Sequence, residues 1–232
     1  MLRKKTSPAA ALVLFDIDGT LLRRSGPHHR EALVAAVRRV AGMETTTDGI
    51  PLHGMLDSDI LTLMMRAGGA SNALIRRILP EIVRCAQAIY VRRCPDLRDK
   101  VCPGVRRLLS GLEKKEIPLG IVTGNLPRIG WKKLERAGLK QYFRLGAFAG
   151  MSKDRAGLVH KAIMQARREG LIGKGAKISL IGDAPADVRA AQANSIQAIA
   201  VATGVTPAED LAAESPHLLL DDLRSLRIKT LL

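Results

Sequence analysis

The sequence predicts an α/β fold in which a Rossmann-like parallel sheet carries helices on both faces, with a small helical domain inserted after the first strand. Short apolar runs bounded by glycine and polar residues are typical of strands that are buried on both faces. Segments with apolar residues at three- and four-residue spacing alternate with these runs, as in βαβ units. One long stretch shows only the helical spacing, which indicates the insert.

The alternating part of the chain is the predicted sheet and its covering helices. The predicted strands are residues 12–15, 119–122, 178–181, 196–201 and 218–220. The predicted helices between them are residues 105–115, 127–137 and 156–168. Ligands bind at the carboxyl ends of the strands in such sheets. The polar residues that follow the first three apolar runs are therefore the candidates for a functional site.

The insert lies between the first strand and the rest of the sheet. Residues 30–40, 58–65 and 73–91 have helical spacing, and no convincing strand separates them. Pro103-Gly104 marks the return to the alternating pattern. We therefore predict a core domain of residues 1–21 and 101–232 and a helical domain of residues 22–100.

The formal net charge is +15 at pH 7, and it is unevenly distributed. Basic residues prevail over residues 105–177, whereas residues 178–232 have an acidic balance. A basic field attracts anions in general, including phosphorylated metabolites and nucleic acid. Many of the basic residues are adjacent pairs such as Lys132-Lys133, which is typical of a solvated helix face. No aromatic residues interleave with them as a stacking platform would require, so nucleic acid is not the expected partner.

Several features bear on the cellular setting. Cys85, Cys94 and Cys102 form no Cys-x-x-Cys pair, which favours reduced thiols over disulfides or zinc. No apolar run approaches the roughly 18 residues that a membrane span needs. The apolar stretch 9–15 ends at Asp16 instead of a small-residue cleavage site. We expect a cytoplasmic monomer or homodimer that does not associate with membranes.

The most informative segment is Asp16-Ile-Asp18-Gly19-Thr20, directly after the first predicted strand. If the chain turns at Gly19, one carboxylate can face a substrate while the other handles a proton. A carboxylate can also attack phosphorus and form an aspartyl-phosphate. An acidic turn or a helix cap after a strand gives the same short pattern, so this segment alone leaves both interpretations open.

Together with two further segments, it resembles the haloacid-dehalogenase-like hydrolases, in the helical-cap subgroup that includes phosphoglycolate-phosphatase-like members. Asp16 to Thr20 resembles the first motif of that family, and Thr123-Gly124-Asn125 resembles the second. Gly182-Asp183-Ala-Pro-Ala-Asp187 resembles the fourth motif, an acidic pair after a strand. The insert lies between the first and second motifs, where this subgroup has its cap domain.

The resemblance implies a magnesium-dependent phosphatase. Asp16 would be the nucleophile, and Asp18 would protonate the leaving alcohol and then deprotonate the hydrolytic water. Mg²⁺ would be held by the carboxylates of Asp16 and Asp183 and by the backbone carbonyl of Asp18, with Asp187 in support. The cation would offset the repulsion between an anionic nucleophile and an anionic substrate.

The same resemblance implies a phosphate-binding group. The Thr123 hydroxyl and the amides of Gly124 and Asn125 would hold phosphate oxygens. The third motif of the family supplies a basic residue ahead of a helix, and both Lys153 and Arg155 stand at such a position. We prefer Arg155 and leave Lys153 as the alternative.

The cap sequence says less about the substrate. Gly54-Met-Leu-Asp57 resembles the cap loop written Gly-x-Thr-Asp, but Leu56 replaces the threonine, which puts any inherited substrate contact in doubt. His28, His29 and Arg30 begin a cap helix and are either substrate contacts or a solvated helix start.

Among the functional alternatives, a dehalogenase is disfavoured because those family members lack an acid equivalent to Asp18. A phosphomutase retains both aspartates and stays an alternative. So does a non-catalytic protein that binds anions or nucleic acid on this fold. The expected function is hydrolysis of a small phosphorylated metabolite.

Overall fold

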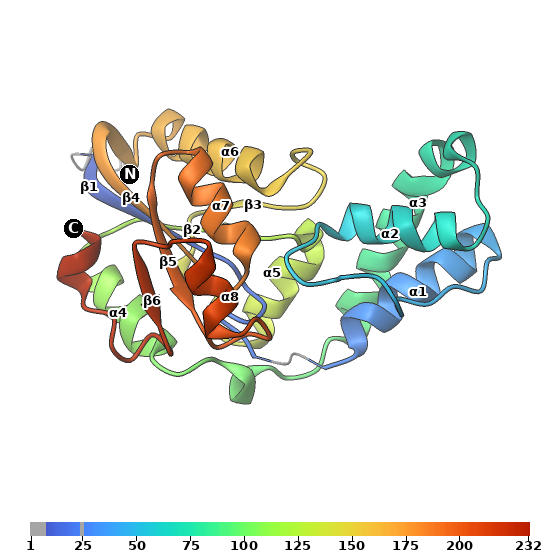
Figure 1. Ribbon diagram of the computed structural model, residues 1–232, viewed down its shortest axis with the longest axis horizontal. Coiled ribbons are helices and arrows are strands. Elements are labelled where there is room, and N and C mark those ends of the chain that lie inside the picture. Colours follow the sequence, from blue (N-terminus) through green and yellow to red (C-terminus); the bar gives the residue numbers. More distant parts are fainter. Residues whose placement is uncertain (1–7, 24–25) are drawn as a thin grey trace, which may run out of the picture.

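The computed structural model describes residues 8–23 and 26–232. Its centre is a six-stranded parallel sheet with the order β3-β2-β1-β4-β5-β6 (Figure 1). The strands are β1 (Ala9–Phe15), β2 (Leu119–Val122), β3 (Leu145–Ala147), β4 (Ile172–Gly182), β5 (Gln197–Val201) and β6 (Leu218–Leu220). This topology confirms the predicted α/β fold.

β1 lies in the interior of the sheet, where it pairs with β2 on one side and with β4 on the other. Its residues 11–15 are completely buried, as the uninterrupted apolar run predicts for a strand covered on both faces. The helices of this part of the chain are α4 (Val105–Lys114), α5 (Pro127–Arg136), α6 (Arg155–Arg168), α7 (Pro185–Ala193) and α8 (Ala208–Ala213).

Four elements of the core differ from the sequence-based expectation. β3 was not predicted because it has only three residues, Leu-Gly-Ala, at the edge of the sheet. The short helices α7 and α8 were not predicted either. β4 begins at Ile172, well before the apolar run 178–181, with a register irregularity opposite β1. Short elements carry little periodicity, so packing against neighbours decides whether they form.

The segment between β1 and β2 is helical, as predicted. It contains α1 (His28–Ala41), α2 (Asp57–Ala67) and α3 (Asn72–Arg93). In Figure 1 these three helices lie together to one side of the sheet. We call these helices, together with the loops that join them, the cap. The division of the chain at residues 21–22 and 100–101 stays a prediction.

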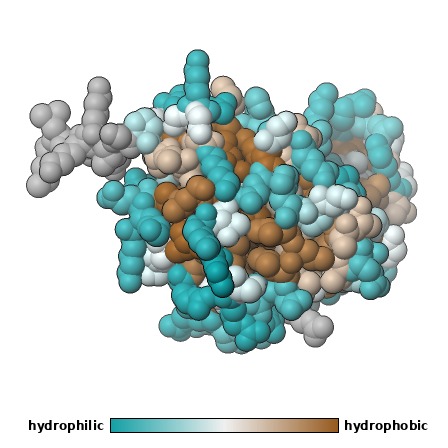
Figure 2. Space-filling model, turned by 60° about the vertical axis from the view of Figure 1, so that its left-hand side comes forward, coloured by the Kyte–Doolittle hydropathy of each residue, from teal (hydrophilic) through white to brown (hydrophobic). Residues whose placement is uncertain are grey.

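The surface has apolar regions that lie apart from the cap. Figure 2 shows hydrophobic side chains gathered at the centre of one face, with hydrophilic side chains around them. A hollow of about 1310 Å³ is lined by residues at the starts of β1 and β2, among them Ala9, Ile117 and Leu119. It lies at the amino ends of these strands. In the described part of the chain, no helix is long and apolar enough to cross a membrane.

Candidate active site

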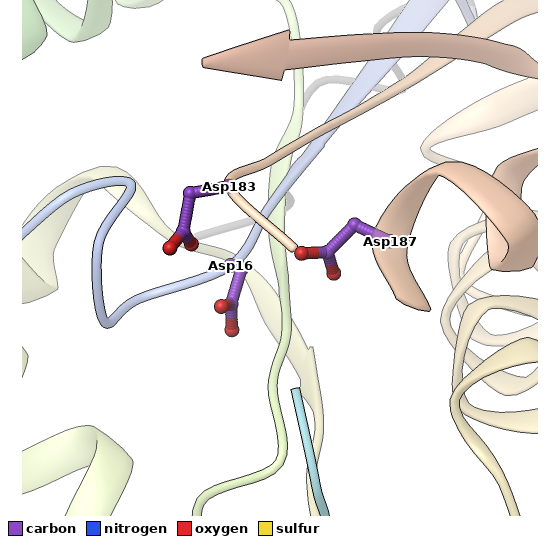
Figure 3. A group of neighbouring side chains, drawn as sticks. All are labelled: Asp16, Asp183 and Asp187. Carbon is purple, nitrogen blue, oxygen red and sulfur yellow. The ribbon is translucent and has the colours of Figure 1, made fainter. Parts of the chain in front are cut away.

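Three buried carboxylates meet at the carboxyl edge of the sheet (Figure 3). Asp16 follows β1, Asp183 follows β4, and Asp187 lies in the first turn of α7. Phe15 and Ile181 are partners in the register of the two strands, which places the residues after them side by side. One carboxylate oxygen from each residue lies within 4.8 Å of the others. The fold therefore gathers three of the four acidic residues that the sequence singled out.

Two glycines make room for the Asp183 carboxylate. A Cβ atom at Gly19 or Gly204 would collide with it, and Gly19 also has a φ of +86°, which favours glycine. The hydroxyl of Thr20 donates a hydrogen bond of 3.0 Å to Asp183 Oδ1. The loop after Asp16 thus serves to enclose a carboxylate from another strand.

The electrostatics of this group favour a cation. Burial, together with the charges of Asp16 and Asp187, raises the pKa of Asp183 well above its ordinary value. Burial also raises the pKa of Asp187 to about 6, although Arg155 offsets part of that rise. Within the described chain, Asp16 Oδ1 and Asp183 Oδ2 are buried without a hydrogen-bond partner. A hard divalent cation with oxygen ligands would satisfy both atoms and relieve the repulsion.

The structure separates the two candidates for the third motif. Arg155 begins α6, is buried, and forms an ion pair with Asp187 while its guanidinium lies 3.4 Å from Asp16 Oδ1. Its Nε is buried without a partner among the described residues, which leaves one donor available to an anion. Lys153 is exposed. The preferred residue lies at the carboxylates and the alternative does not.

The second motif lies at the end of β2, next to the first. Thr123 is fully buried, and Asn125 Nδ2 donates to Thr123 Oγ1 at 2.9 Å and to Asp18 Oδ2 at 2.8 Å. A Cβ atom at Gly124 would collide with the carbonyl oxygen of Met55 in the cap. This position therefore requires glycine because the cap loop rests directly on it.

Asp18 is separate from the carboxylate group. Its side chain is 39% exposed, and its Oδ2 accepts hydrogen bonds from Lys133 Nζ at 2.5 Å and from Asn125. Partial burial of its carboxyl on its own raises the pKa of Asp18. The charge and hydrogen bond of Lys133, together with contributions from His29 and from the Asn125 hydrogen bond, outweigh this and lower the pKa to about 2. Metal binding by its backbone carbonyl stays a prediction.

The prediction that Lys133 is solvated was wrong. Lys132-Lys133 was taken as a solvated pair, but only Lys132 is partly exposed, with an ion pair to Glu135. The side chain of Lys133 is 1% exposed. The helical spacing contained a signal for this, because Lys133 lies four residues after the buried Ile129 and therefore on the same face of α5.

The start of α1 also contacts the site. His29 Nε2 lies 2.9 Å from Asp57 Oδ2, which accepts a 2.7 Å hydrogen bond from the amide of Leu126 in the core. Arg30 is exposed. Leu56, in the position of the expected threonine, is buried just before α2. Of the histidine pair, His29 therefore faces the core side of the cap.

A further histidine, His53, lies at the site and was not predicted from the sequence. His53 Nε2 lies 2.6 Å from Thr206 Oγ1 and 3.5 Å from Asp183 Oδ2. His53 is a cap residue, whereas Thr206 and Asp183 belong to the core. No local pattern indicated this contact, because it joins segments that are far apart in the sequence.

Comparison with known proteins places this site in a family. Residues 10–194 match the haloacid dehalogenase-like hydrolases. The phosphoglycolate phosphatase of Pseudomonas putida is 30% identical over 230 residues, covering 93% of this chain and 78% of the relative. That of Nitrosococcus oceani is 24% identical over 95% of this chain and 96% of the relative. The chain belongs to the haloacid dehalogenase-like hydrolases.

Solved structures share the fold. CbbY from Rhodobacter sphaeroides in complex with phosphate has a TM-score of 0.69 at 18% identity, covering 94% of this chain and 96% of that one. The β-phosphoglucomutase of Clostridium difficile has a TM-score of 0.69 at 18% identity, covering 96% and 95%. At this identity the likeness concerns the arrangement of sheet and cap.

Proposed function

We propose that this hydrolase is a magnesium-dependent phosphatase that cleaves a small phosphorylated metabolite through an aspartyl-phosphate on Asp16. The observation that carries the proposal is the buried carboxylate group with Arg155 against it. Asp16 and Asp183 each offer a buried oxygen without a hydrogen bond to a cation, and Arg155 offers a buried N–H without a hydrogen bond to an anion. Phosphoglycolate, named for the relatives in Pseudomonas and Nitrosococcus, is the first substrate to test.

In this proposal the reaction has two displacements. Asp16 attacks phosphorus, and the bond from phosphorus to the ester oxygen breaks. Asp18 is a carboxylate in the substrate-free site, where its pKa is about 2, so it must take up a proton together with the substrate before it gives that proton to the leaving oxygen. The Asp18 carboxylate then takes a proton from water, which attacks the aspartyl-phosphate and releases phosphate. Asp16, Asp183 and Asp187 would hold Mg²⁺, which supplies positive charge next to the phosphoryl group.

The proposal is tested by hydrolysis of p-nitrophenyl phosphate and of phosphoglycolate, with Mg²⁺ and with a chelator. Release of phosphate that requires the metal supports it. A folded protein that releases no phosphate from a broad panel of phosphate esters contradicts it. Return of the phosphoryl group to another hydroxyl of a sugar phosphate would instead identify a phosphomutase.

Substitution of Asp18 by asparagine is expected to slow the second displacement much more than the first, so that the aspartyl-phosphate accumulates. Nitrophenolate is a good leaving group and needs no proton, so the first displacement continues, whereas the second loses its base. We expect one equivalent of nitrophenolate in a burst, followed by steady turnover about 10²–10⁴-fold slower than wild type. Stopped-flow absorbance measures both phases.

The exposed Asp221→Asn variant is the control and should show no burst. Wild-type turnover in Asp18→Asn would contradict the assigned role.

Arg155 and Lys153 provide a matched pair. Arg155→Met removes the buried cation at the phosphate site and is expected to lower kcat/KM by about 10²–10³-fold. Lys153→Met removes an exposed charge and should stay within about 2-fold of wild type. Steady-state kinetics give the comparison, and thermal unfolding verifies that Arg155→Met is folded, since Asp187 loses its partner. Equal losses in the two variants would contradict this assignment.

A further inference from the structure

Lys133 is a buried cation that none of the family's motifs accounts for. It projects from α5, and its Nζ lies 2.5 Å from Asp18 Oδ2 and 3.1 Å from His29 Nδ1. The Tyr90 ring of the cap lies next to it, with the centroid 6.0 Å from Nζ. A buried ammonium is costly unless it is paired and hydrogen-bonded. Here its partners come from both the catalytic loop and the cap.

The contacts continue beyond His29. An ammonium group only donates hydrogen bonds, so His29 Nδ1 accepts from Lys133 and His29 Nε2 carries the hydrogen that it donates to Asp57. Asp57 in turn accepts from the Leu126 amide and donates its own amide to the carbonyl of Gly124 at 2.8 Å. A chain of hydrogen bonds therefore connects Lys133 of the core to His29 and Asp57 of the cap, and Asp57 is bonded to core backbone beside the second motif.

We propose that Lys133 is a positioning residue that makes closure of the cap and alignment of the Asp18 carboxylate one event. This inference rests on the proposed function of Asp18. With the cap closed, one ammonium group holds Asp18 and His29 together, and Tyr90 covers it. If the cap moves away, Lys133 loses His29 and its cover at the same time. The arrangement thereby ties the orientation of the acid and base to the closed cap.

A double-mutant cycle separates positioning from a general structural role. Lys133→Met is expected to lower kcat for p-nitrophenyl phosphate by about 10²-fold in the wild-type background. In the Asp18→Asn background the same change should cost less than about 3-fold, because Lys133 acts through a carboxylate that is already absent. Equal fold-losses in both backgrounds would overturn the proposal.

The neighbouring lysine is the matched control. Lys132→Met removes a partly exposed charge from the same helix and should leave kcat within about 2-fold of wild type. Lys133→Gln keeps a donor of similar length and should recover part of the lost rate. It also serves as the second variant if Lys133→Met does not fold, which thermal unfolding reveals. Loss in Lys132→Met as large as in Lys133→Met would overturn the specific role of Lys133.

A second cycle does not depend on activity. Lys133→Met and His29→Leu each remove one side of the contact between core and cap, so the double variant should lower the thermal midpoint by less than the sum of the single changes. Additive changes would overturn the contact, whatever the enzyme does. A coupled midpoint in a protein that hydrolyses no phosphate ester would instead contradict the proposed function while leaving the connection between cap and core in place.

Discussion

Asp16→Asn is expected to abolish phosphate-ester hydrolysis while the protein stays folded. The amide oxygen is a poor nucleophile, so no aspartyl-phosphate forms at this position. We expect kcat to fall by about 10⁴-fold or more, as for removal of other enzymic nucleophiles. Steady-state release of nitrophenolate measures the loss. Failure to trap phosphate covalently on the variant, in contrast to wild type, would support the assignment independently.

The same substitution is expected to stabilise the metal-free protein. Asp16 is one of three buried carboxylates, and its charge contributes to the raised pKa of Asp183. Replacing it with a neutral amide of the same shape removes that repulsion. A gain of about 1 kcal/mol would raise the thermal midpoint by about 2–4 °C for a chain of this size. Asp221→Asn at the exposed end of β6 is the control and should change neither rate nor midpoint. Near wild-type turnover in Asp16→Asn would show that the nucleophile is another residue.

Removal of the divalent cation is the second change with a very large expected effect. A chelator should abolish turnover, and added Mg²⁺ should restore it, because Asp16 and its substrate are both anionic. The cation should also stabilise the fold by about 2.7 kcal/mol when its concentration is 100 times its dissociation constant. Thermal unfolding over a range of Mg²⁺ concentrations measures this. A thermal midpoint that does not change with Mg²⁺ concentration would contradict a metal site at the carboxylates.

The metal effect should depend on pH, with a definite sign. The unfolded pKa of an aspartate is about 4, and burial raises that of folded Asp187 to about 6 and that of Asp183 well above its ordinary value. Their protonated forms therefore stabilise the metal-free fold fully below about pH 4. This contribution is lost as the pH rises through the folded pKa. Metal binding must release these protons, so stabilisation by Mg²⁺ should grow over the same window.

Thermal midpoints with and without Mg²⁺ between about pH 4 and 8 test that sign. Without Mg²⁺, we expect the thermal midpoint to lose the stabilisation from the protonated carboxyls as the pH rises to about 6, the pKa of Asp187. Over the same range, the increase in midpoint on adding Mg²⁺ should become larger. Asp187→Asn should weaken both trends because it removes one of the titrating groups. An equal Mg²⁺ shift at the two ends of the range would mean that other ligands hold the cation.

Local signals in the sequence determined the sheet and the centre of the site. An uninterrupted apolar run followed by Asp16 identified β1, and similar runs placed Thr123 and Asp183 after β2 and β4. In a parallel sheet the carboxyl ends of neighbouring strands meet, so these residues had to converge once the strand order was formed. The helical insert was also evident, because its spacing never changes to that of a strand.

Only the tertiary structure decided which member of each pair of neighbouring basic residues contacts the buried carboxylates or Asp18. Lys153 or Arg155, and Lys132 or Lys133, are chemically similar within each pair. The rotation of α5 against the sheet turns Lys133 inward and leaves Lys132 partly exposed. The start of α6 buries Arg155, whereas Lys153, which precedes the helix, is exposed. The spacing from the buried Ile129 indicated the inward face of α5. The partners that a buried Lys133 meets depend on packing over the whole helix, which neighbouring residues in the sequence do not specify.

The contacts between cap and core could not be predicted from the sequence either. His29 lies far from Lys133 along the chain, and Asp57 lies far from Leu126. These pairs meet only because the cap brings α1 and the start of α2 onto the end of β2 and onto α5. The sequence thus determined which chemical groups follow the strands, since strand and turn preferences are local. The partners of those groups were decided by tertiary packing. Asp18 meets Lys133 and Asn125 within the core, and Lys133 meets His29 of the cap.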